Sequence, residues 1–127
     1  MKTIKLVLSF LLVTVFTNVH SQDKYPNGQV KSKGNKQNGE YIEYYENGKI
    51  FKKLNYVNGK QDGECIVYFD SGKIRQKDNA INGKLIGDFI SYFENGKISS
   101  TSTYVNGDLN GKGFIYYETG KLKYKVN

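Results

Sequence analysis

Residues 44–50 read YYENGKI, and three later stretches nearly repeat them: YFDSGKI at 68–74, YFENGKI at 92–98 and YYETGKL at 116–122. Each copy starts 24 residues after the start of the copy before it. Two further series of glycines, which include Gly59 and Gly63, recur with the same period. Such periodicity indicates a repeat architecture, in which one unit is stable only when it is stacked on its neighbours.

Each repeat is predicted to form a β-hairpin. The stretch at 41–45 is rich in aromatic and β-branched residues, which favour strands. The pair Asn47-Gly48 predicts a two-residue type I′ turn, because both central residues of that turn need positive φ. In this register Glu46 lies opposite Lys49, and the equivalent pairs of opposite charge are Asp70–Lys73, Glu94–Lys97 and Glu118–Lys121.

The second strand of the first full hairpin should run from Lys49 to about Tyr56, after which the looser stretch 58–63 leads to the next hairpin. An isolated hairpin is marginal in water, whereas stacked hairpins bury a continuous stripe. We therefore expect an all-β fold, an elongated open antiparallel meander of stacked β-hairpins with about ten strands. Its units are a short first one at about 25–40, full ones at about 41–64, 65–88 and 89–112, and a partial one at 113–127.

The pattern YYENGKI…YVNGKQDG, repeated from Tyr25 to Asn127, resembles the variant class of MORN repeats. This resemblance implies a single elongated antiparallel sheet that is used for binding. Bacterial proteins of this class are often described as antitoxin-like members of toxin–antitoxin systems. The resemblance therefore also implies neutralisation of a toxin as one candidate function.

The N-terminus has the pattern of a secretory signal peptide. Lys2 and Lys5 accompany an apolar run of 11 residues at 6–16, and a polar stretch ends at Ser21. The run is shorter than the ~20 residues of a membrane-spanning helix. We expect residues 1–21 to be removed and the mature protein to be secreted or periplasmic, without a transmembrane span; a retained anchor or a buried strand is the alternative. The mature chain keeps 17 basic and 12 acidic residues, and its charge of +5 permits an acidic partner.

The mature chain lacks the residue types on which common catalytic and metal sites depend. The only histidine, His20, lies in the predicted signal peptide, and Cys65 is the only cysteine. Activated nucleophiles usually need a histidine base, and zinc sites need several His or Cys ligands. We therefore predict no enzyme, no cofactor and no metal. Cys65 is expected to be a small buried residue, with a free thiol or an intermolecular disulfide as alternatives.

Side chains alternate across a strand, so the sheet has two faces. We call the side of Tyr41 and Leu54 the first face, and the side of Ile42 and Lys53 the second face. In the predicted register the first face also carries Tyr45, Ile50, Cys65, Val67, Phe69, Ile74, Phe89, Phe93, Ile98, Ile115, Tyr117 and Leu122, and it is expected to be dry. The second face also carries Phe51, Ile66, Ile90, Ser99, Phe114 and a row of tyrosines, so both faces have an apolar row; the lysines at mid-strand positions of the second face indicate that it is the wet one. The candidate binding residues on it are Tyr44, Tyr68, Tyr92, Tyr116, Lys53, Arg75, Lys77, Lys123 and Lys125.

Three functions are compatible with these features. The first is a non-enzymatic scaffold that mediates protein–protein interaction. The second is binding of acidic glycan or lipid headgroups at the cell envelope, with tyrosines as stacking platforms. The third is the antitoxin-like role, and nucleic acid is not expected as a partner. The tyrosine row also has a purely structural explanation, because cross-strand aromatic pairs stabilise sheets.

Overall fold

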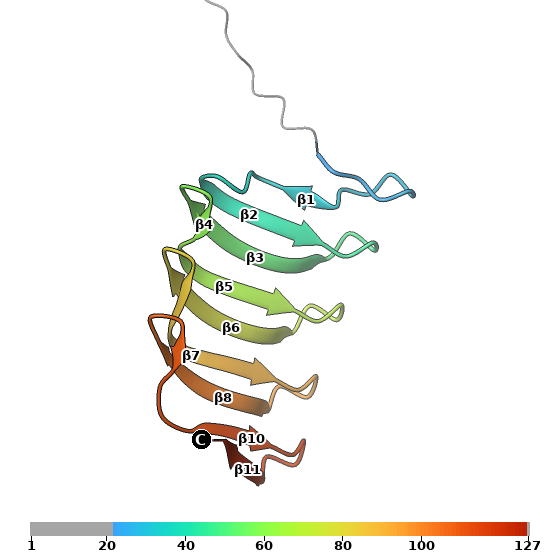
Figure 1. Cartoon of the computed structure of the whole chain (residues 1–127). Coiled ribbons are helices and arrows are strands. Elements are labelled where there is room, and N and C mark those ends of the chain that lie inside the picture. The colour runs from blue at the N-terminus through green and yellow to red at the C-terminus, as the bar shows by residue number, and fades with distance from the viewer. Residues whose placement is uncertain (1–21, 127) are drawn as a thin grey trace, which may run out of the picture.

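The computed structural model describes residues 22–126, so the predicted signal peptide at 1–21 lies outside the described residues. It confirms the all-β meander of hairpins: the described chain forms one open antiparallel sheet without helices. Figure 1 shows the strands stacked in a single row, from β1 at one end to β11 at the other. The strands are β1 (Ser32–Lys33), β2 (Gly39–Tyr44), β3 (Ile50–Val57), β4 (Lys60–Gln61), β5 (Gly63–Tyr68), β6 (Ile74–Ile81), β7 (Lys84–Tyr92), β8 (Ile98–Val105), β9 (Asp108–Leu109), β10 (Gly113–Tyr116) and β11 (Leu122–Val126).

The main strands follow one another in the order β1-β2-β3-β5-β6-β7-β8-β10-β11, while the two-residue strands β4 and β9 pair with β3 and β8. Each strand therefore pairs with its neighbours in sequence, as a stack of hairpins requires. The turns within the hairpins lie along one long side of the sheet, and the turns between successive hairpins lie along the other (Figure 1).

The turn within each hairpin differs from the predicted one. The N–H of Gly48 donates to the carbonyl of Tyr45, and the N–H of Tyr45 donates to the carbonyl of Lys49. Positive φ occurs at Gly48 but not at Asn47. This is a three-residue loop, a type I turn closed by a left-handed glycine, and not a type I′ turn. The side chain of Asn47 accepts a hydrogen bond from the N–H of Lys49, which explains the preference for Asn, Ser or Thr before the glycine.

The predicted pairing of opposite charges across this turn is consequently wrong. Lys49 lies opposite Tyr45, and its ammonium group donates instead to the carbonyl of Asp70 in the next repeat. Lys73 and Lys97 make the same kind of bond, to the carbonyls of Glu94 and Thr119. The lysines after the turns therefore connect neighbouring repeats.

Type I′ turns do occur, but on the opposite side of the sheet, in the stretch that was predicted to be looser. Asn58 and Gly59 have φ values of 50° and 77°, and the flanking residues Val57 and Lys60 pair with each other. Asn82-Gly83 and Asn106-Gly107 repeat this geometry. The turns stack, because the N–H of Gly83 donates to the carbonyl of Gln61 in the preceding turn region.

A β-bulge next to each three-residue loop moves several residues to the other face. Glu43 lies opposite Lys52 as predicted, whereas Tyr44 lies opposite Ile50, so Phe51 is an extra residue. The same shift makes Arg75, Ser99 and Lys123 the extra residues of the later hairpins. Ile50, Ile74, Ile98 and Leu122, predicted for the first face, therefore lie opposite tyrosines of the second face.

The four extra residues lie on the first face, contrary to the prediction. The ring of Phe51 packs against that of Tyr45 with centroids 5.1 Å apart. The guanidinium of Arg75 lies 5.9 Å from the ring of Phe69, and the ammonium of Lys123 lies 5.2 Å from the ring of Tyr117. The register places Ser99 in the equivalent position.

The first face is the dry one, as predicted. All the buried side chains of the sheet strands lie on it: Tyr41, Leu54, Cys65, Val67, Asp78 and Ala80. No second layer of the described chain covers either face, so the buried side chains are covered by their neighbours on the same face; Phe51 and Tyr56, for example, pack against the cluster of Tyr41, Leu54, Cys65 and Val67.

Candidate interaction surface

The second face carries an apolar surface beside the three-residue loops. In the first full repeat it consists of Ile42, Tyr44 and Ile50, where Tyr44 and Ile50 face each other across the hairpin. The bulge creates this surface, because it brings the aliphatic residue after each loop to the side of the tyrosines. We call the twelve residues the apolar row: Ile42, Tyr44, Ile50, Ile66, Tyr68, Ile74, Ile90, Tyr92, Ile98, Phe114, Tyr116 and Leu122.

None of the twelve residues is buried. Ten are half-buried, while Ile98 and Leu122 have exposed fractions of 40% and 46%. Soluble proteins seldom leave a contiguous apolar surface of several hundred square ångströms exposed, and larger patches usually mark a binding site. The apolar row is partly accessible in all four repeats and is therefore a candidate contact surface.

Along one line across the strands, lysines alternate with isoleucines of the apolar row. Ile42 pairs with Lys53, Lys53 with Ile66, Ile66 with Lys77, and Lys77 with Ile90. The row continues through Thr101 and Phe114 to Lys125.

Carboxylates lie on the same face, two residues further from the three-residue loops than Ile42 and its equivalents. Glu40 and Glu64 pair with Asn55 and Asn79, and Asp88 pairs with Thr103, whose hydroxyl donates to it at 3.0 Å. A shallow hollow of about 290 Å³ lies among Glu40, Lys53, Asn55, Glu64 and Ile66. Across the second face, apolar residues beside the loops are followed by a row in which lysines alternate with apolar residues, and then by carboxylates. The face is therefore less uniformly basic than the sequence suggested.

Seven of the nine predicted binding residues come together on this face. They are the four tyrosines and three of the lysines: Tyr44, Tyr68, Tyr92, Tyr116, Lys53, Lys77 and Lys125. Arg75 and Lys123 lie on the opposite face, over aromatic rings. The prediction missed Ile50, Ile74, Ile98 and Leu122, because strict alternation from a two-residue turn assigns them to the wrong side.

The first face offers no activated group at Cys65. This residue is buried, as predicted. Burial is the main reason why the pKa of its thiol is raised to about 11, and the nearby carboxylate of Asp78 also contributes. A thiol with such a pKa is protonated at neutral pH and is a poor nucleophile. Asp78, also buried, accepts hydrogen bonds from the side-chain amides of Gln76 at 2.8 Å and Gln61 at 3.3 Å.

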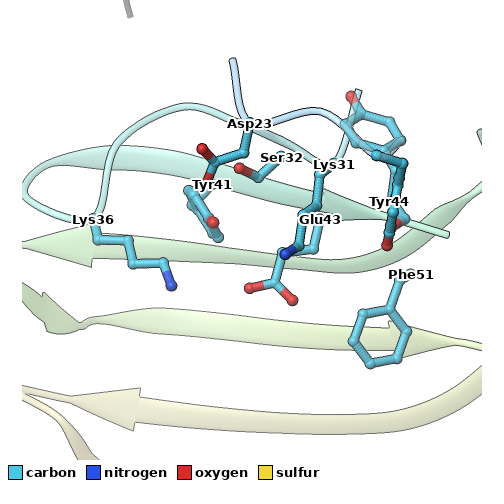
Figure 2. A pocket seen from close by; sticks show the side chains of 9 residues that line it. Asp23, Lys31, Ser32, Lys36, Tyr41, Glu43, Tyr44 and Phe51 are labelled. Carbon is cyan, nitrogen blue, oxygen red and sulfur yellow. The ribbon is translucent and has the colours of Figure 1, made fainter. Parts of the chain in front are cut away.

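A hollow of about 290 Å³ lies on the first face where the N-terminal segment meets β2 and β3. Figure 2 shows Lys36 and Glu43 reaching out on either side of Tyr41, with Phe51 further along the sheet. The ammonium of Lys36 lies 5.0 Å from the ring of Tyr41, and Glu43 approaches Lys52 to 4.0 Å. Acidic and basic groups alternate around this hollow, so it selects neither an anion nor a cation.

Among residues 22–126 no group of three or more His, Cys, Asp or Glu side chains is arranged to hold a metal ion. Nor does this part of the chain contain a helix that is long and apolar enough to cross a membrane.

Comparison with known proteins agrees with the repeat structure. The family model described as MORN repeat variant matches four consecutive segments, residues 37–58, 61–82, 85–106 and 109–127. No curated protein and no solved structure shows significant similarity to the chain. The four matched segments follow the 24-residue period of the sheet and cover more than half of the sequence. The chain therefore belongs to the MORN repeat variant family, whose repeats are generally modules for interaction with proteins or membranes.

Proposed function

We propose that this chain is a non-enzymatic scaffold, secreted or periplasmic, that binds another protein along the second face of its sheet. The observation that carries the proposal is the apolar row, which stays accessible over four repeats while the buried side chains gather on the other face. An extended repeat surface of this kind suits a partner that makes contacts along several repeats at once.

The charges beside the apolar row favour a protein partner over an acidic glycan or lipid headgroup. On the second face, Lys53 lies diagonally across the hairpin from Glu40, and Lys77 lies diagonally across the next hairpin from Glu64. A uniformly acidic ligand would meet these carboxylates as well as the lysines, and like charges oppose binding. A protein surface can match strips of different character, because it carries apolar, acidic and basic side chains together.

Photo-cross-linking in cells tests this proposal. Tyr92 and Phe93 are adjacent in sequence but lie on opposite faces, so a photoreactive phenylalanine derivative at each position gives a matched pair. We expect a discrete protein adduct from position 92 and none from position 93. Adducts from position 93 alone, or from neither position, would contradict the proposal. The identity of the adduct also distinguishes an envelope protein from a cytoplasmic toxin.

The proposed location rests on the signal-peptide pattern at 1–21. Mass spectrometry of the protein purified from its host should show an N-terminus near Gln22. An intact Met1 on protein from the cytoplasmic fraction would contradict export and favour an intracellular partner.

A further inference from the structure

The three junctions between successive hairpins use one geometry. At the first, Lys52 and Lys53 of β3 pair with Val67 and Ile66 of β5. At the second, Gln76 and Lys77 of β6 pair with Ser91 and Ile90 of β7, and at the third, Ser100 and Thr101 of β8 pair with Ile115 and Phe114 of β10. The second strand of each hairpin therefore receives an antiparallel strand in a fixed register, with Ile or Phe opposite its Lys or Thr.

Side chains at the loops also bind the incoming strand. The hydroxyl of Tyr45 donates to the carbonyl of Tyr68 at 2.6 Å. Lys49, Lys73 and Lys97 donate to carbonyls of the following loop at distances between 2.7 and 3.0 Å. Each junction is thus a strand-binding site that recognises backbone carbonyls as well as the strand edge.

The last strand that the structure describes, β11, carries the side chains of the same site. It pairs with β10 along one edge, and no described residue pairs with its other edge. Tyr124 and Lys125 occupy the positions of Lys52 and Lys53, Tyr117 that of Tyr45, and Lys121 that of Lys49. Among residues 22–126 neither the Tyr117 hydroxyl nor the Lys121 ammonium has a hydrogen-bond acceptor, and Tyr117 and Tyr124 are 50% and 51% exposed.

We propose that the free edge of β11 binds an extended acidic segment of another protein, which joins the sheet as an added antiparallel strand. Strand addition to an exposed sheet edge is a common mode of peptide recognition, in which main-chain hydrogen bonds give affinity and alternate side chains give specificity. The junctions fix the register: an aliphatic or aromatic residue lies opposite Lys125. Further along the segment, one carbonyl accepts from the Tyr117 hydroxyl and another from the Lys121 ammonium.

The charge of β11 selects the partner. Lys121, Lys123 and Lys125 lie on or beside this strand, which has no acidic residue. Two copies of β11 paired edge to edge would bring together two strands that are rich in lysine and carry no acidic residue, and charges of the same sign repel each other. An acidic strand meets the same lysines favourably, so the site is built for a different chain.

The chain itself supplies a probe. The peptide with the sequence of residues 88–95, DFISYFEN, contains the strand that β6 binds internally and carries two acidic residues. Labelled and capped at both ends, it should bind the purified protein saturably in fluorescence polarisation. Hydrogen exchange should show protection of alternate amides in β11, those that face outwards, and of no other edge.

A matched pair of variants tests the docking geometry. Tyr117→Phe should weaken peptide binding about threefold to tenfold, the effect of losing one hydrogen bond. It should leave the fold intact, because Phe69 and Phe93 occupy the equivalent positions of the middle repeats. Tyr124→Phe removes a hydroxyl of the same exposure that the proposal does not use, so peptide affinity should not change.

Charge exchange provides the second test. Lys123→Glu together with Lys125→Glu should abolish binding of the peptide, and a peptide with Asp88→Lys and Glu94→Lys should bind this variant instead. The proposal is overturned if the peptide does not bind or protects residues outside β11. Formation of a dimer with protected β11 amides in the absence of peptide would overturn it in favour of self-pairing. None of these outcomes depends on the apolar row, so the proposed function is judged separately.

Discussion

The backbone N–H of Tyr45 donates a hydrogen bond of 2.8 Å to the carbonyl of Lys49, and this bond closes the first full hairpin around a three-residue loop. The equivalent residues close the later hairpins in the same way. This relationship determines which side chains share a face. Two residues further along, the bulge at Phe51 adds one position to β3, and beyond it the pairing is that expected from a two-residue turn. Only the residues next to the loop therefore change sides.

The two kinds of Asn-Gly turn should respond differently to substitution. Asn58 has positive φ, so Asn58→Thr should lower the free energy of unfolding by about 1–3 kcal/mol, because a β-branched residue is strained there. Asn47→Thr should cost less than about 0.5 kcal/mol, since Thr119 occupies the equivalent position in the last repeat. Urea denaturation of the two variants provides the comparison. Equal losses would mean that the turns have the same conformation.

The hydrogen bond that the Tyr45 hydroxyl makes to the next repeat can be removed by one substitution and introduced at another repeat by a second substitution. Tyr45→Phe should destabilise the protein by about 0.5–1.5 kcal/mol, because the Tyr68 carbonyl loses its donor. Phe93→Tyr should stabilise it by a similar amount, since the new hydroxyl can reach the carbonyl of Tyr116 in the next repeat. Thermal unfolding measures both changes, and a neutral or destabilising Phe93→Tyr would contradict the equivalence of the junctions.

The dry face should dominate the stability of the sheet. Leu54 is 5% exposed, and Leu54→Ala should lower the free energy of unfolding by about 2–5 kcal/mol. Leu122 lies on the second face with 46% of its surface exposed, so Leu122→Ala should change it by about 0.5 kcal/mol or less. Chemical denaturation tests the pair. A larger loss at Leu122 would mean that the second face is the one that is covered.

The thiol of Cys65 gives the protein a specific alkaline sensitivity. Its pKa rises from an ordinary value of 9.0 to about 11 in the folded protein, because burial disfavours the thiolate. The folded state thus holds the proton more tightly, so this contribution to stability is complete below pH 9 and disappears as the pH rises towards 11. Denaturation curves between pH 8 and pH 11 should show a steeper loss for the wild type than for Cys65→Ala. The thiol should also react slowly with iodoacetamide at pH 7 unless the protein is unfolded, and fast reaction of the folded protein would contradict its burial.

Much of this architecture could be predicted from the sequence. The 24-residue period fixed the stack of hairpins, and the inner pairs such as Tyr41–Leu54 and Ile42–Lys53 have the predicted register. The burial of Cys65 and the dry character of the first face were also predicted correctly. These features depend on periodicity and on the alternation of apolar residues, both of which can be read directly from the chain.

The details beside the loops could not be obtained from the Asn-Gly motif alone. Asn-Gly suits the last two positions of a three-residue loop as well as the centre of a type I′ turn. The distinguishing signal was weaker: Ser71 and Thr119 replace asparagine in one series, and neither favours positive φ, whereas the series of Asn58 keeps asparagine throughout. The bulge leaves no residue-type signal, because Phe51, Arg75, Ser99 and Lys123 have no chemistry in common. Ile50, Ile74, Ile98 and Leu122, the part of the apolar row next to the loops, were missed for this reason.

The most direct test of the central claim compares Lys77→Glu with Arg75→Glu, two charge reversals two residues apart on opposite faces. The measurement is the affinity of each variant for the protein cross-linked at position 92, determined by titration calorimetry. If that protein binds the second face, Lys77→Glu should weaken binding by about tenfold, equivalent to about 1.4 kcal/mol, while Arg75→Glu leaves the affinity unchanged. Loss of binding in Arg75→Glu with full binding in Lys77→Glu would contradict the account and place the partner on the first face.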